Sequence, residues 1–275
     1  MKFFYSFLVP GIVMASFLLQ GCRINDPVEP SPESVNPDAP LLRKLTWSNG
    51  MTGVFEYNPD STIKTVGYSL QTAGDQNQYS WVGGRMVEMA SFASIYKNVY
   101  YYRVDGKLDS IVNKYKELQQ PSGYRLDFQY AVNGRPETLR YYQNTEAGPI
   151  LKTTTTYEYY ANGDLFRATT VSGNSTITHT IESYSAACYV FPWAYISGSL
   201  DEFYTIYNYP LLSRMDKLPA KITRRIKTAS SQPVVDRINT FTFEISDKRL
   251  DKLTSVSTFP SFPQYDNTIE TVYWY

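Results

Sequence analysis

The sequence is poor in the residues on which most metal and catalytic sites depend. Its 275 residues include one histidine and two cysteines, whereas a zinc site takes three or four ligands, most often His and Cys. It contains no G-x-S-x-G, P-loop or G-x-G-x-x-G motif, so the common sequence signals of an activated serine or a bound nucleotide are missing. We therefore expect no metal, no cofactor and no assignable catalytic residue, and we favour a protein that is not an enzyme.

An excess of charge is also missing. Lys and Arg together number 26, as do Asp and Glu, and charged residues make up 19% of the chain, below the usual share of about 25%. Nucleic-acid-binding domains carry a clear basic excess that neutralises phosphates. The charge balance therefore argues against a nucleic-acid partner.

The few Cys and His residues of the domain have structural explanations. Cys188 lies in the apolar stretch AACYVF, where a thiol behaves as a small buried hydrophobe. His179 alternates with Ile177 and Ile181 on one face of an expected strand. We therefore interpret Cys188 as a core residue and His179 as a hydrogen-bonded sheet residue, neither as a nucleophile, ligand or base.

The apolar stretch at the N-terminus, residues 3–19, is short for a membrane helix, which needs about 20 residues. It leads into Leu19-Gln20-Gly21-Cys22, which resembles a bacterial lipobox. The resemblance implies that residues 1–21 are a lipoprotein signal peptide, that the chain is cleaved before Cys22, and that Cys22 is acylated. The alternative is an uncleaved membrane anchor.

Residues 22–41 are expected to hold the lipidated cysteine and a linker. Five prolines and four acidic residues lie between residues 23 and 40, and they keep the segment extended and solvated. At about 3.1 Å per residue it could span roughly 50 Å. Arg23 follows the cysteine, where enterobacterial lipoproteins retained at the inner membrane carry Asp. The resemblance thus favours lipid anchoring at the outer membrane and leaves open whether the domain faces the periplasm or the cell surface.

Aromatic residues are abundant, with 25 Tyr, 14 Phe and 4 Trp, and such residues favour the pleated, half-buried surfaces of sheets. Many of them recur in one motif, an aromatic-x-aromatic triplet followed by a turn. Its fullest copies are YYYRVDGKL (100–108), FQYAVNGRP (128–136) and YEYYANGDL (157–165), with a weaker copy at 55–63 and a degenerate one at 241–250.

Each copy of the motif predicts a β-hairpin. Alternation along a strand puts both rings of the triplet on one face, and Asp-Gly or Asn-Gly indicates a two-residue type I′ turn. The turn glycines are Gly106, Gly134 and Gly163. The repeat period of 28 to 29 residues leaves room for four short strands or two longer ones. We expect residues 42–275 to be all-β, a large curved antiparallel sheet or an open barrel of repeated hairpins.

One helical insertion is expected near residues 199–217. S-x-x-E at 199–202 fits a capping box, apolar residues follow at helical spacing, and Pro210 is expected to end the helix. Such a helix would pack on the sheet, plug one end of it, or act as a lid over a cavity. The residues that would form the lid or binding face are Phe203, Tyr204 and Tyr207.

The motif Y-x-Y-x-x-N-G-x-L resembles the YD/RHS type of repeat. Together with the lipobox, the Pro-rich linker and KLPAKITRR (217–225), the sequence is similar to Bacteroidetes lipoproteins of unknown function with a porin-like fold, the DUF4595 type. The resemblance implies an extensive antiparallel sheet, curved or barrel-like, and provides no catalytic residues to transfer.

Three functions are consistent with these features. The favoured one is a non-catalytic ligand-binding module, held at a membrane by its N-terminal lipid, with glycan, lipid or protein as the ligand. The alternative is a structural or assembly component of an outer-membrane surface complex. A carboxylate-dependent glycosidase is the second alternative, because two carboxylates need only meet in space. Exposed tyrosines would provide the binding face, and the pattern does not indicate which ones.

Overall fold

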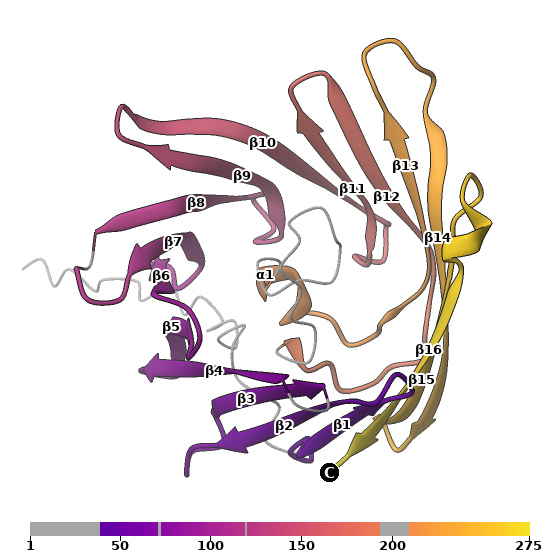
Figure 1. Ribbon diagram of the computed structural model, residues 1–275, viewed down its shortest axis with the longest axis horizontal. Helices are drawn as coiled ribbons and strands as arrows, with labels where there is room; N and C mark the ends of the chain where they lie inside the picture. The colour runs from indigo at the N-terminus through magenta and orange to yellow at the C-terminus, as the bar shows by residue number, and fades with distance from the viewer. Residues whose placement is uncertain (1–38, 71–72, 119, 193–208) are drawn as a thin grey trace, which may run out of the picture.

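The chain folds as a closed antiparallel barrel. The computed structural model describes residues 39–70, 73–118, 120–192 and 209–275, and within them sixteen strands follow one another around the barrel in chain order. Each strand pairs with the next one in sequence, and β1 pairs with β16 to close the ring, which is seen end-on in Figure 1. The all-β prediction is confirmed, and of its two forms the barrel is the correct one, closed rather than open.

The strands and helical segments have the following bounds. The strands are β1 Lys44–Trp47, β2 Met51–Tyr57, β3 Ile63–Leu70, β4 Ala73–Val82, β5 Arg85–Ser91, β6 Tyr96–Tyr102, β7 Leu108–Tyr115, β8 Pro121–Tyr130, β9 Pro136–Thr145, β10 Gly148–Tyr159, β11 Leu165–Ser172, β12 Ser175–Tyr184, β13 Pro219–Lys227, β14 Val234–Ser246, β15 Arg249–Thr258 and β16 Asn267–Trp274. The helical segments are α1 Tyr209–Leu212 and η3 Pro263–Tyr265.

The barrel is apolar inside and charged outside. Along β2, Phe55 is buried while Glu56 is exposed, and along β10 Tyr157 is buried while Glu158 is exposed, as expected when side chains alternate between two faces. The inward-facing residues form one hydrophobic core cluster. On the outer face, neighbouring strands are joined by ion pairs: Lys97–Glu88, Arg167–Glu158, Lys221–Glu182 and Lys252–Glu270.

The two aromatic positions of the repeated motif have different roles. The first ring is buried in the core, and either Phe or Tyr occupies it, as at Phe55, Tyr100 and Phe128. In the copies whose second ring is Tyr or Trp, this ring donates to a main-chain oxygen at or near the start of an earlier strand, at 2.6–3.0 Å. Tyr184, at the end of β12, makes the same contact at 2.5 Å without belonging to a ring pair. We call this set the aromatic ladder: Tyr57 to Leu42, Trp81 to Ile63, Tyr102 to Met86, Tyr130 to Leu108, Tyr159 to Pro136, Tyr184 to Leu165 and Tyr275 to Leu250.

Basic side chains cover six rings of the aromatic ladder. The charged group lies 5.3–5.7 Å from the ring centroid in each pair, within the range of a cation–π contact: Arg43 on Tyr57, Arg85 on Tyr102, Arg103 on Tyr130, Arg135 on Tyr159, Lys217 on Tyr184 and Arg249 on Tyr275. In most pairs the base belongs to the hairpin that precedes the ring. Successive hairpins are therefore joined by a hydrogen bond and a stacked cation as well as by the sheet.

The glycine turns differ from the type I′ turns expected. At the β6–β7 loop, the N–H of Gly106 donates to Arg103 O at 3.0 Å and the N–H of Arg103 donates to Lys107 O at 2.9 Å, which leaves a three-residue loop. Only the glycine has positive φ, +85°, the pattern of a type I turn followed by a bulge. Asp105 instead accepts a hydrogen bond from Lys107 N through its side chain, at 3.1 Å.

Gly134 and Gly163 have the same turn, with φ of +79° and +96°. The prediction of two-residue turns was wrong at these positions because a side-chain oxygen on the Asp or Asn can stabilise the turn without positive φ. Two consecutive residues with positive φ occur instead at Gly83–Gly84, between β4 and β5, and at Asp247–Lys248, in the degenerate copy between β14 and β15. Each repeat thus contains two longer strands rather than four short ones.

The segment between β12 and β13 fills one end of the barrel. Its described residues, 185–192 and 209–218, are called the plug here; Figure 1 shows α1 inside the ring of strands. All four residues of α1 are buried. Arg214 Nη1 donates to Gly134 O at 2.8 Å, and Tyr189 N donates to Lys248 O at 2.8 Å. The plug therefore contacts hairpin loops from two parts of the barrel.

The expected helical insertion is confirmed as the short helix α1, but its limits differ from the prediction. Pro210 was expected to end a helix, but helical residues continue past it to Leu212. The helix expected from residue 199, with Phe203, Tyr204 and Tyr207, lies outside the described residues, as do Cys22 and the linker up to residue 38. No helix in the described part of the chain is long and apolar enough to cross a membrane.

The chain enters and leaves the barrel at the same end. Leu42, just before β1, accepts the hydrogen bond of Tyr57 at the end of β2, and Tyr275, just after β16, donates to Leu250. The glycine turns lie at this end too, because each one follows the second ring of its motif. We call this end, with its hairpin loops and the plug, the plugged rim.

Candidate functional site

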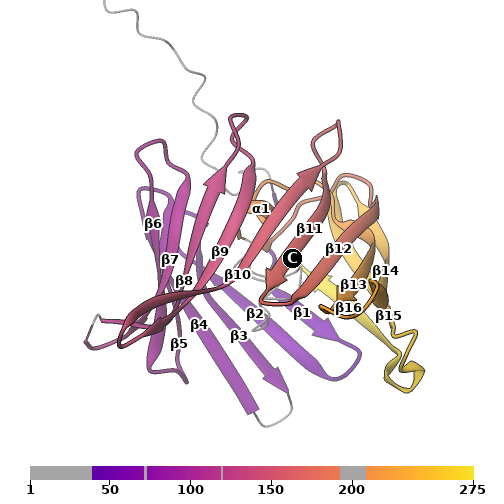
Figure 2. The same ribbon diagram turned by 90° about the horizontal axis from the view of Figure 1, so that it is seen from above.

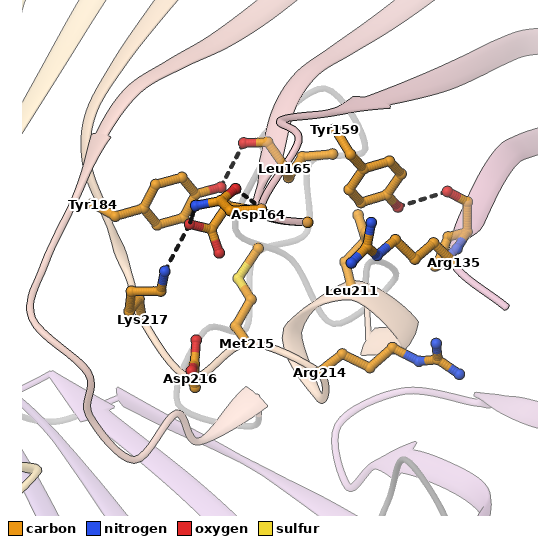
Figure 3. A pocket seen from close by; sticks show the side chains of 13 residues that line it. Arg135, Tyr159, Asp164, Leu165, Tyr184, Leu211, Arg214, Met215, Asp216 and Lys217 are labelled. Atoms are coloured by element: carbon orange, nitrogen blue, oxygen red, sulfur yellow. Dashed lines mark hydrogen bonds and ion pairs between the residues drawn. The ribbon is translucent and has the colours of Figure 1, made fainter. Parts of the chain in front are cut away.

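The plugged rim contains a cavity of about 390 Å³. It lies between the β8–β9 loop, the β10–β11 loop and the plug, as Figure 3 shows. Arg135 and Tyr159 are on one side of it, and Tyr184 and Lys217 on the other. The side chains that give the cavity its chemistry are Arg135, Tyr159, Asp164, Tyr184, Arg214 and Lys217.

The hairpin repeat places two of these charged groups. Arg135 directly follows the turn glycine Gly134, and Asp164 directly follows Gly163. The two residues therefore occupy the same position on adjacent hairpins, one basic and one acidic. A Cβ at Gly163 would overlap the guanidinium of Arg135, so glycine is needed there for close approach as well as for its positive φ.

The plug supplies the two other charged groups. Lys217 Nζ lies 2.7 Å from Asp164 Oδ2, and this hydrogen bond to the carboxylate raises the pKa of Lys217. The same Nζ lies 5.7 Å from the centroid of the Tyr184 ring. Burial raises the pKa of the phenols of Tyr159 and Tyr184, so both stay neutral at physiological pH. The ion pair and the stacked cation hold the plug against the hairpin loops, and neither phenol provides a phenolate nucleophile.

Arg135 and Arg214 are the groups available to a ligand. Within the described residues, neither guanidinium has a carboxylate at ion-pair distance, and Arg214 makes one side-chain hydrogen bond, to Gly134 O. A guanidinium has five N–H donors in a planar fork that matches carboxylate and phosphate oxygens. The cavity is therefore suited to binding an anionic group beside the two tyrosine rings.

A second concavity, of about 670 Å³, lies on the outer face of β6 to β9, strands that run side by side in Figure 2. Its basic groups already have partners. Arg125 pairs with Asp127, and Lys114 Nζ lies 5.3 Å from the ring centroid of Tyr101. The cavity at the plugged rim is the better candidate, because Arg135 stacks on Tyr159 and Arg214 donates to Gly134 O, but neither guanidinium is neutralised by a carboxylate at ion-pair distance in the described residues.

Of the residues selected from the sequence, the turn glycines Gly134 and Gly163 lie beside this cavity, while Gly106 lies in the β6–β7 loop. Sequence reasoning did not select Arg135 or Arg214. The position of Arg135 after a turn glycine was an available signal, since Lys107 occupies the same position one hairpin earlier. The local sequence does not indicate that Arg214 lines a cavity, because its position depends on how the plug enters the barrel.

Two other residues singled out in the sequence lie in the core. Cys188 is a free, buried cysteine, and burial raises the pKa of its thiol, so it is unreactive at neutral pH. His179 is buried on β12. No group of three or more His, Cys, Asp or Glu side chains in the described residues could hold a metal ion.

Several solved structures resemble this fold. A porin-like protein from Bacteroides uniformis ATCC 8492 matches with a TM-score of 0.56 and 13% sequence identity, over 86% of this chain and 98% of that chain. A porin-like protein from Bacteroides vulgatus ATCC 8482 matches with a TM-score of 0.45 and 12% identity, over 86% and 99% of the two chains. No family model and no curated protein matches the sequence.

The first of these similarities confirms the porin-like barrel that the sequence resemblance implied. At 13% identity it supports the fold alone. The lipid anchor and the relation to YD/RHS repeats stay predictions.

Proposed function

We propose that this protein is a lipoprotein of the outer membrane, anchored through acylated Cys22, whose barrel binds a ligand without catalysis at the plugged rim. The observation that carries the proposal is the cavity in which, among the described residues, Arg135 and Arg214 have no carboxylate at ion-pair distance. The ligand is a glycan, lipid or protein that presents an anionic group to these two side chains.

The outer face of the barrel supports an aqueous position for the domain. A membrane-spanning barrel turns an apolar band about 25 Å tall towards the lipid. Here the outward face carries cross-strand ion pairs such as Lys97–Glu88 and Lys252–Glu270, together with exposed apolar side chains such as Val54 and Val171. A barrel of this kind stands in water, and a lipid on the N-terminal linker is then the means of holding it at a membrane.

The anchor is tested by mass spectrometry of the N-terminal peptide and by metabolic labelling with palmitate. We expect a mature chain that begins at Cys22 and incorporates the label, and no incorporation into the Cys22→Ala variant. A mature chain that still contains residues 1–21 would show that the lipobox assignment is wrong.

The binding site is tested on the full-length protein in detergent, against a panel of acidic glycans, phospholipid headgroups and acidic peptides. We expect the double variant Arg135→Gln with Arg214→Gln to weaken binding of the best panel member at least tenfold. The matched control is Arg167→Gln, which removes an outer-face arginine paired with Glu158. Equal binding by the wild type and the double variant would exclude this cavity as the site.

A further inference from the structure

We propose that the plugged rim lies directly on the surface of the membrane that holds the anchor, and that the cavity binds the phosphate of anionic lipid headgroups in that surface. The inference rests on the proposed function, which it deepens by naming the ligand. Three observations carry it: where the chain enters the barrel, three exposed valines, and the unpaired arginines.

The path of the chain brings the plugged rim towards the anchor. The described chain begins at residue 39 and reaches β1 at Lys44 from this rim. Cys22 precedes the first described residue by 17 positions, so the linker reaches at most roughly 50 Å from that point. The opposite rim is farther away by the length of a strand of about ten residues, roughly 33 Å. A tether attached at the plugged rim allows this rim to lie directly on the bilayer, but because the linker is longer than the barrel is tall, the valines and arginines must decide which rim faces the membrane.

Exposed valines project from three consecutive hairpins of this rim. Val82 ends β4, and Val104 and Val132 lie at the tips of the β6–β7 and β8–β9 loops, with side chains 68%, 107% and 108% exposed. In water, an exposed valine at a loop tip makes no stabilising contact, and Ser or Asn would suit the turn equally well. At a membrane surface the same side chains enter the boundary between headgroups and acyl chains.

Three arginines without a carboxylate partner among the described residues lie on the same part of the plugged rim as these valines. Arg85, Arg135 and Arg214 have no carboxylate at ion-pair distance within the described residues. The nearby acids Asp105 and Asp164 pair with lysines, at 3.4 Å and 2.7 Å, while Asp216 is exposed.

Guanidinium groups bind phosphate oxygens with two parallel hydrogen bonds, and cations near an anionic leaflet are attracted to its negative surface potential. A phosphate-bearing lipid surface matches this combination of exposed valines and arginines that have no carboxylate partner among the described residues. A neutral glycan would leave these charges without a partner.

The test uses the full-length, lipid-anchored protein reconstituted in vesicles of phosphatidylcholine with or without phosphatidylglycerol. A polarity-sensitive fluorophore is attached at Val132→Cys, or at Ala147→Cys as the matched control, since Ala147 is an exposed loop residue between β9 and β10 at the opposite rim. Cys188 is buried and does not compete for the label. Nitroxide lipids then report which label contacts the bilayer.

We expect the label at position 132 to be quenched at least twofold more than the label at 147, and the difference to grow with phosphatidylglycerol. Combining Val132→Cys with Arg135→Gln and Arg214→Gln should abolish the dependence on phosphatidylglycerol. Equal quenching at the two positions, or stronger quenching at 147, would overturn the inference.

A second arm separates this inference from the proposed function. Glycerol phosphate in solution is titrated against the wild type and the double arginine variant. Arginine-dependent binding of free glycerol phosphate without quenching at position 132 would leave the cavity as an anion site and remove the membrane contact. If the double variant changes neither glycerol phosphate binding nor quenching, the cavity is not the site and both proposals fail.

Discussion

Two tyrosines of the repeated motif predict opposite results for the same substitution. Tyr130 occupies the second position, and its hydroxyl donates a 2.8 Å hydrogen bond to Leu108 O. Tyr79 occupies the first position of a copy between β4 and β5; it is 5% exposed, and its hydroxyl has no hydrogen-bond partner in the described residues. Replacing each by Phe removes one oxygen and leaves the ring in place.

The expected changes in the free energy of unfolding follow from the interactions that each hydroxyl group makes. Tyr130→Phe removes a net contribution of about 0.5–1.5 kcal/mol and leaves a part-buried carbonyl without that donor, so the free energy of unfolding should fall by about 1–2 kcal/mol. Tyr79→Phe removes a polar group that was buried without compensation, so stability should stay unchanged or rise by about 1 kcal/mol.

The assay is thermal unfolding followed by near-ultraviolet circular dichroism. For a domain of this size, 1 kcal/mol corresponds to a shift in Tm of about 2–4 °C. We expect Tyr130→Phe to lower Tm by about 2–8 °C and Tyr79→Phe to leave it unchanged or raise it. Tyr265→Phe, at a 63% exposed position, should have no effect and serves as the control. Equal losses at positions 130 and 79 would refute the division of the motif into a packing ring and a donor ring.

Three further predictions concern single positions. Gly163→Ala should destabilise the barrel by about 0.5–1 kcal/mol more than Gly173→Ala, because both positions have positive φ but only a Cβ at 163 displaces a side chain, the flexible Arg135 guanidinium that stacks on Tyr159; equal melting temperatures would contradict this. Cys188 should react with a thiol reagent at pH 8 only after unfolding, since it is buried and its thiol pKa is raised; stoichiometric labelling of the folded protein would show that the plug opens. The pKa of Lys217 is raised in the folded state by Asp164, so its stabilisation is complete below about pH 10 and is lost as the pH rises through the raised pKa. The Lys217→Met variant should therefore lose less stability than the wild type between pH 9 and 11 in denaturant titrations, and identical pH profiles would argue against the ion pair.

The hairpins could be predicted from the sequence because each one is a local feature. An aromatic-x-aromatic triplet and a glycine turn lie within ten residues, and both act within one pair of strands. Two further copies were missed for different reasons. Tyr79-x-Trp81 has a Gly-Gly turn in place of Asn-Gly, and Tyr273-x-Tyr275 comes without an Asn-Gly or Asp-Gly pair in the given sequence. The motif that matters physically is the ring pair, and the turn residues vary.

Closure of the barrel and the composition of the cavity could not be predicted, because both depend on contacts between distant parts of the chain. Nothing near β1 indicates that it pairs with β16 rather than forming a free edge. Likewise, the cavity needs Arg214 from the plug beside Gly134, 80 residues away in sequence. The expected lid residues, Phe203, Tyr204 and Tyr207, lie outside the described residues and stay a prediction.

The pairing of the first strand with the last has a consequence for how the protein folds. A contact of the aromatic ladder such as Tyr130 to Leu108 joins residues 22 apart, so successive hairpins can dock one by one in chain order. Trp274 instead donates to Thr46 across 228 residues, at 3.2 Å. Contacts between residues so far apart form slowly. Until these contacts form, the partly folded sheet has two unpaired edge strands that can pair with strands of other molecules. A polypeptide truncated before residue 267 would lack β16, and both edges would stay unpaired.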